Sequence, residues 1–128
     1  MGKLKTFSQC MNYTLENQPN WMERFDEDGN EVGGRKAAIV NCSHFINMYG
    51  RSFPVDKIDQ SIMLALRARS KKELNHRAST WNKILSAVHT VLSFCHAAEQ
   101  VAQPPRFQPR SLRLREDELQ VDFFTMQE

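Results

Sequence analysis

Apolar residues recur at helical spacing in the longest patterned stretch of the chain, between residues 76 and 103. Positions three and four residues apart lie on one face of a helix. That face would carry Trp81, Ile84, Leu85, Val88, Val91, Leu92 and Cys95. The pattern predicts a long helix that begins between Asn75 and Ser79 and buries this face in a core. We expect it to end near Gln103, because the two prolines that follow cannot continue a helix.

Two shorter helices are predicted in the first half of the chain. The first is capped by Thr6 or Ser8 and reaches about Asn17. The second spans Arg35 to Tyr49, and the glycine that follows is a natural stop. Between them lies FDEDGNEVGG, whose acidic run and Asp-Gly and Gly-Gly pairs indicate an exposed loop or short turn.

A third helix is expected after Pro54, which fixes an extended entry. It should begin at about Asp56 and end in a basic tail from Arg67 to Lys72. Cations at a helix C-terminus also complement the helix dipole, so this tail has a purely structural explanation as well. Four helices predict an all-α fold, a four-helix bundle, occupying residues 5–105.

The last segment, residues 106–128, is predicted to be a linker followed by an extended C-terminal tail. Leu119 to Phe124 could form a short strand. Thr125 and Glu128 have the spacing of a capping box, which marks the start of a helix. These features indicate a linker and the truncated start of another domain.

Charge is distributed unevenly along the 128 residues, although the net charge is only +2. Residues 1–34 hold three lysines and arginines against six acids, for a net −3. Residues 35–110 hold twelve against four, a net +8, and residues 111–128 hold two against five, a net −3. Clustered lysine and arginine gain affinity for polyanions by releasing counterions from phosphates. The basic middle therefore favours a polyanion-binding surface, unless folding disperses its charges.

The basic tip of the long helix carries the most specific candidate site. It is formed by His76, Arg77, Ser79, Thr80, Asn82 and Lys83. Acidic residues are the ones that normally stabilise the first turn of a helix, and none occurs here. This composition suggests contact with a DNA phosphate.

Composition excludes several other classes of function. No apolar run approaches the roughly 20 residues of a membrane-spanning helix, and the first ten residues lack the features of a secretion signal, so we expect a cytoplasmic protein. Cys10, Cys42 and Cys95 lie far apart, without ligand spacing, and are expected to be reduced thiols. The four histidines complete no metal set, so neither a metal nor another cofactor is expected. Paired carboxylates and nucleophile motifs are also missing, which gives no support to an enzyme.

Several of these segments resemble the core-binding domain of tyrosine recombinases, the phage integrase class. They are a tryptophan in an early polar stretch, the helix ending HFINMYG, the PVDKIDQSIMLAL helix, and STWNKILSAVHTVLSFCHAAEQVAQPP. The last is the most specific, and DFFTMQE resembles the family's entry into its catalytic domain. The resemblance covers about residues 6–105 and implies a SAM-like four-helix bundle that clamps duplex DNA for integration and recombination.

The resemblance also implies roles for individual residues. Thr80 and Lys83 would contact phosphate or groove, and the second helix would supply Arg35 and Lys36. Lysine stands at position 83, where the family frequently has arginine. An ammonium group cannot form the paired hydrogen bonds that a guanidinium forms with a base, so we assign Lys83 to contacts with the DNA backbone rather than to base readout. The full set of candidate DNA-binding residues is Arg35, Lys36, Lys71, Lys72, Arg77, Thr80, Asn82 and Lys83.

The family's catalytic groups, a tyrosine nucleophile with its arginines, lysine and histidines, belong to a domain that these residues do not include. Tyr13 and Tyr49 stand outside the nucleophile context, so this chain alone should not cut DNA. The implied partners are double-stranded DNA, a catalytic domain in cis and other protomers of a bacterial or phage-encoded recombinase. The alternative is a helical interaction or assembly module for an acidic protein partner. One concave face containing Arg35, Lys36, Arg77 and Lys83 would favour DNA, and a scattered arrangement would favour the alternative.

Overall fold

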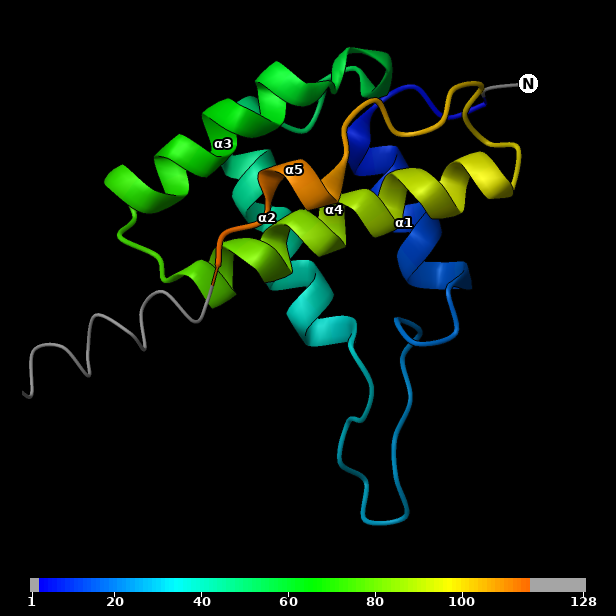
Figure 1. The fold of residues 1–128 in the computed structure, drawn as a ribbon. Coiled ribbons are helices and arrows are strands. Elements are labelled where there is room, and N and C mark those ends of the chain that lie inside the picture. Colours follow the sequence, from blue (N-terminus) through cyan, green and yellow to red (C-terminus); the bar gives the residue numbers. More distant parts are fainter. Residues whose placement is uncertain (1–2, 116–128) are drawn as a thin grey trace, which may run out of the picture.

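The computed structural model describes residues 3–115, which form an all-α fold (Figure 1). In chain order its elements are α1 (Phe7–Asn17), α2 (Arg35–Tyr49), the 3₁₀ turn η1 (Val55–Lys57), α3 (Gln60–Lys72), α4 (Ala78–Ala97) and α5 (Pro109–Leu112). Over the described range the chain forms isolated β-bridges but no strand. The strand and the capping box predicted after residue 118 lie outside the described residues.

The long helix α4 is the centre of the molecule, and α1, α2, α3 and α5 all pack against it (Figure 1). All seven residues of the predicted apolar stripe are buried, with Trp81, Leu85, Val88, Val91 and Cys95 fully inaccessible. Facing helices add Phe7, Phe45 and Met63 to the same core. The predicted stripe is therefore confirmed as the core face of α4.

The first two helices begin and end where the sequence predicts. Thr6 caps α1 in a capping box, because its hydroxyl accepts from the Gln9 amide and the Gln9 side chain accepts from the Thr6 amide. α2 runs from Arg35 to Tyr49 and stops at Gly50. The three cysteines are free and buried, as expected, and burial raises the pKa of Cys42 to about 12.

The third and fourth helices differ from the prediction at one end each. The expected start of α3 near Asp56 is occupied by η1, and α3 itself begins after Asp59, whose carboxylate accepts from the Ile62 amide at 3.1 Å. α4 ends at Ala97 rather than near Gln103. There Glu99 adopts a left-handed φ of 61°, and the Gln100 amide returns to the Cys95 carbonyl at 2.8 Å. Local capping bonds therefore end the helix before the prolines.

The packed region extends past the boundary expected at residue 105. Phe107 and Leu112 are buried in the core, and α5 forms a helical turn where only a linker was predicted. The Trp81 indole donates to the Leu112 carbonyl at 2.9 Å, and Arg67 donates to the same oxygen at 3.2 Å. Residues 106–115 belong to the helical body because apolar side chains and main-chain oxygens fix them to α3 and α4.

The segment between α1 and α2 forms a narrow hairpin that reaches away from the helices (Figure 1). It is closed by an antiparallel bridge between Phe25 and Glu31 and by a bond from the Val32 amide to the Arg24 carbonyl. The predicted exposed turn is thus confirmed, with a more regular geometry than a loop.

Candidate functional site

An open groove of about 460 Å³ lies between α2 and the first half of α4. Its walls come from both helices and from the chain after α5. The lining residues are Trp21, Gly34, Ala37, Ala38, Asn41, Ser79, Asn82, Lys83, Ser86, Ala87, Thr90 and Arg113. None of these is acidic, so the groove carries two cations without a compensating carboxylate in its lining.

The chemistry of the groove follows from its side chains. Lys83 and Arg113 are exposed and supply the positive charge. Ser79, Ser86 and Thr90 are spaced at intervals of seven and four residues, so their hydroxyls lie on one side of α4. Small residues of α2 form the opposite wall. A chain of phosphates could approach closely here, with ammonium, guanidinium and hydroxyl groups as donors.

Asn82 is bonded to the segment that carries Arg113 rather than facing solvent. It is only 4% exposed, its amide nitrogen donates to the Leu114 carbonyl at 2.8 Å, and its amide oxygen accepts from the Leu114 main-chain nitrogen at 2.9 Å. These two bonds hold residues 113–115 against the first turns of α4. Asn82 lines the groove, but both bonds direct its polar atoms to the protein.

Arg35 and Lys36 do not lie in the groove. Arg35 is partly buried, and its Nη1 donates to the carbonyls of Leu15 and Trp21 at 2.9 and 3.2 Å. The Lys36 side chain is 84% exposed and lies 4.0 Å from Glu31 at the base of the hairpin. Of the four residues that were to share one concave face, only Lys83 lines this one.

The remaining candidate residues lie around the start of α4. Lys71 and Lys72 are exposed in the last turn of α3, and Arg77 is exposed at the N-cap of α4. Thr80 is half-buried in the first turn and does not line the groove. The structure therefore gathers positive charge at this end of the molecule, outside the groove itself.

A histidine pair marks the same end of the groove. His44 lies one turn beyond Asn41 on α2, His76 precedes Ser79 by three residues, and their ring centroids are 4.9 Å apart. The Ser70 hydroxyl fixes His76 through Nδ1 at 2.8 Å. Desolvation, with the nearby His76 and Arg69, lowers the pKa of His44. Burial therefore favours the neutral imidazole of His44.

Sequence reasoning missed Arg113, Asn41, Ser86 and Thr90. For Arg113 a signal was present, because leucine and arginine alternate through SLRLR, as they do in an extended segment with one buried side. Leu112 is indeed buried, and Arg113 and Arg115 are exposed. The other three residues carry no distinguishing pattern, since a polar residue beside an apolar stripe normally faces water.

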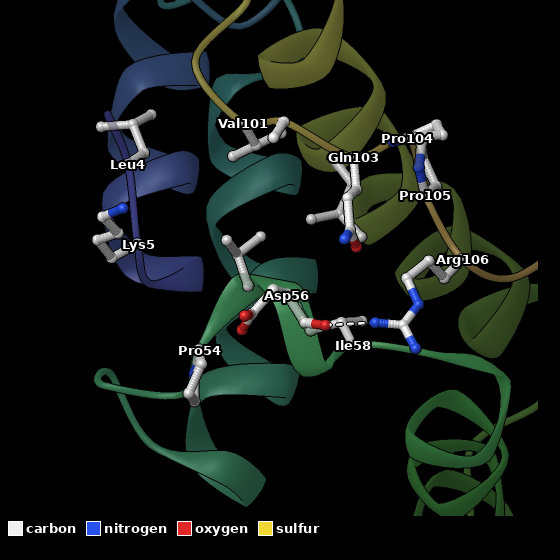
Figure 2. Close-up of a pocket in the computed structure, with 13 residues that line it drawn as sticks. Leu4, Lys5, Pro54, Asp56, Ile58, Val101, Gln103, Pro104, Pro105 and Arg106 are labelled. Carbon is white, nitrogen blue, oxygen red and sulfur yellow. Dashed lines mark hydrogen bonds between the residues drawn. The ribbon is translucent and has the colours of Figure 1, made fainter. Parts of the chain in front are cut away.

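A second hollow of about 370 Å³ lies between the start of the chain, the η1 region and the segment that follows α4 (Figure 2). We call it the proline pocket, because Pro54, Pro104 and Pro105 line it together with Leu4, Lys5, Val55, Asp56, Ile58, Leu92, Val101, Ala102, Gln103 and Arg106. Arg106 is fixed at its edge by a bond from Nη1 to the Asp56 carbonyl at 2.6 Å. This pocket is mostly apolar and contains an acid, so it is less suited to phosphates than the groove.

The described residues contain neither a candidate metal cluster nor a candidate membrane-spanning helix. Among residues 3–115, no three or more His, Cys, Asp or Glu side chains are grouped where they could hold a metal ion. Within the same range, no helix combines the length and hydropathy needed to cross a bilayer.

Comparison with known proteins gives no family assignment. No family model matches the chain, and neither the curated proteins nor the solved structures contain a significant match. The resemblance to tyrosine recombinases therefore rests on the sequence motifs alone.

Proposed function

We propose that this chain is the SAM-like core-binding module of a tyrosine recombinase and that it binds duplex DNA along the groove between α2 and α4. The observation that carries the proposal is the meeting of Lys83 and Arg113, 30 residues apart in sequence, in a groove whose lining contains no acid. Neither α2 nor α4 has an acidic residue in its first turn, so no side chain of either first turn offsets the positive end of its helix dipole.

The proposed mode of binding is contact with the sugar–phosphate backbone. Lysine and hydroxyl groups position DNA without reading its sequence, so binding should be sequence-tolerant, with dissociation constants in the micromolar range or weaker at physiological salt. Lys71, Lys72 and Arg77 would add long-range attraction at one end of the groove. Strand cleavage would belong to a catalytic domain in cis, and neighbouring protomers on the same DNA would complete the assembly.

The proposal is tested by fluorescence anisotropy of a labelled duplex across a salt series. The logarithm of the affinity should fall linearly with the logarithm of the salt concentration. Changing both Lys83 and Arg113 to Gln should reduce the magnitude of that slope by about 2, because each phosphate contact contributes roughly 0.9. The loss should be similar for unrelated duplex sequences.

A matched control separates the groove from general charge. Lys36→Gln combined with Lys57→Gln removes the same charge from two exposed positions outside the groove lining. This pair should leave the slope nearly unchanged. Equal effects of the two double variants would reject the groove, and the absence of binding at low salt would reject DNA as the ligand.

The interaction module remains the alternative. It is favoured by the dispersal of Arg35 and Lys36 away from the groove and by exposed apolar side chains on the hairpin, where Phe25 is 59% exposed. The DNA proposal is preferred because Arg113 lines the groove and provides a second cation there, although Arg35 and Lys36 do not line it. A protein-binding module would show a shallow salt dependence with DNA and an apolar contribution to partner binding.

A further inference from the structure

The hairpin of residues 22–32 is built as a firm projection. Besides the bridge between Phe25 and Glu31, Asp26 organises its tip, because one carboxylate oxygen accepts from the amides of Asp28 and Asn30, each at 2.9 Å. The Asp26 amide also donates to the Asn30 carbonyl at 2.9 Å. A projection held in this way can enter a recess with little loss of conformational entropy.

The hairpin exposes both apolar and acidic groups. Phe25 is 59% exposed, Met22 41% and Val32 36%, although apolar side chains of this size are usually covered. The segment also holds five acids and one arginine. Its complement would be an apolar recess with cations at the rim.

The proline pocket has these properties. Its 370 Å³ is within the usual range of about 300–1,000 Å³ for ligand pockets. Apolar side chains such as Leu4, Ile58 and Val101 line it, and Lys5 and Arg106 lie on opposite sides of it (Figure 2). Asp56 is the single acid among its lining residues, so the cations outnumber it.

The two surfaces lie at opposite ends of the molecule. In Figure 1 the hairpin extends from the bottom of the helical body, whereas the segments that line the pocket, residues 4–5, 54–58 and 101–106, meet at the top. One molecule therefore cannot place its own hairpin in its own pocket. We propose that the pocket receives the hairpin of a second copy of this chain, with Phe25 in the apolar recess and the acidic tip beside Lys5 and Arg106.

This contact would be head to tail, because the two copies use different surfaces. Such contacts form rings when the rotation closes and open chains when it does not. An open chain keeps one free hairpin at one end and one free pocket at the other. The proposal does not depend on DNA binding and is tested without DNA.

The first measurement is self-association of the chain by analytical ultracentrifugation over a range of concentrations. The wild-type protein should associate reversibly. Phe25→Ser should weaken the association by about tenfold or more, as expected for an aromatic anchor at the centre of a contact. The matched control is Val40→Ser, since Val40 is also an apolar residue that is 59% exposed but lies on α2. Its association should equal that of the wild type.

The decisive measurement mixes two deficient variants. Phe25→Ser lacks the hairpin anchor, and Lys5→Glu combined with Ala102→Glu makes the pocket acidic at two exposed positions. Each variant alone should associate about tenfold more weakly than the wild type, or weaker still. The mixture should form a heterodimer with near wild-type affinity, because one partner retains the pocket and the other the hairpin. Chemical shift changes in the ¹⁵N-labelled Phe25→Ser protein should then map to residues around the pocket.

Three outcomes would overturn the proposal. They are a wild-type protein that stays monomeric at NMR concentrations, deficient variants that self-associate as strongly as the wild type, and a mixture that associates no more strongly than either variant alone. A circular dichroism spectrum and an unfolding midpoint close to those of the wild type would show that each variant is folded.

Discussion

Asn82 connects the buried stripe of α4 to the segment that carries Arg113. Asn82→Ala removes the two bonds to Leu114 and leaves main-chain groups without these partners, which should cost on the order of 1–3 kcal/mol of unfolding free energy. It should also weaken DNA binding, because Arg113 loses its support. Hydrogen exchange of the Leu114 amide, measured beside DNA affinity, reports the two effects separately.

The control for this prediction is Ser86→Ala, which alters an exposed side chain in the same groove. It should leave the exchange of the Leu114 amide unchanged and reduce DNA affinity only slightly. If the Leu114 amide stays fully protected in Asn82→Ala, then Asn82 is not a positioning residue.

Residue roles were harder to predict than residue locations. Lys83 was expected near the solvent-exposed start of the long helix, and it is exposed there. Asn82 was expected beside it as a DNA contact, yet a polar side chain can serve either solvent or a distant main-chain segment. The role of Asn82 is determined by the packing of residues 112–114 against α4. That contact joins positions more than 30 residues apart in sequence.

At the scale of elements, the hairpin depends on Gly33. It has φ +95°, and a Cβ added there would lie 2.9 Å from Nη2 of Arg24 and 3.2 Å from the Asn20 carbonyl oxygen. Gly33→Ala should therefore combine a backbone cost of about 1–2 kcal/mol with a steric conflict at the base of the hairpin. Faster hydrogen exchange of the Val32 amide, which bonds the Arg24 carbonyl, would measure the loosening.

Gly29→Ala is the matched substitution at the tip of the hairpin. Gly29 has a similar φ of +83°, but nothing lies within 4 Å of the added Cβ. It carries the backbone cost without the clash, so the Val32 amide should exchange more slowly than in Gly33→Ala. Equal exchange in the two variants would show that the contact with Arg24 and Asn20 has no effect.

Helices were predicted well because their determinants are local. Apolar periodicity located α4, and capping residues located the start of α1 and the end of α2. The end of α4 was misjudged because the left-handed turn at Glu99 precedes the prolines. α5 was missed because four residues give too little periodicity, and their burial depends on contacts with α3 and α4.

At the scale of the whole molecule, the charge blocks of the sequence become separate surfaces. The acidic hairpin projects at one end, and basic residues gather where α3 ends and α4 begins. Segregation of this kind allows one small module to attract a polyanion and to present an acidic contact elsewhere. The groove between α2 and α4 could not be predicted from charge alone, since two of the expected cations serve α1 and the hairpin.

Two half-buried histidines, His44 and His89, should make the stability of the whole fold depend on pH. Desolvation, with His76 and Arg69 nearby, lowers the pKa of His44, and burial lowers that of His89, both from an ordinary value of 6.5. Below about pH 6.5 the unfolded chain therefore binds more protons than the folded one, so the unfolding free energy falls as the solution is acidified. Urea unfolding at pH 7.5 and 5.5 measures this difference. His44→Gln combined with His89→Gln should make the difference smaller, because neither glutamine titrates. A difference unchanged in the double variant would assign the acid sensitivity to other groups, such as carboxylates that titrate at lower pH.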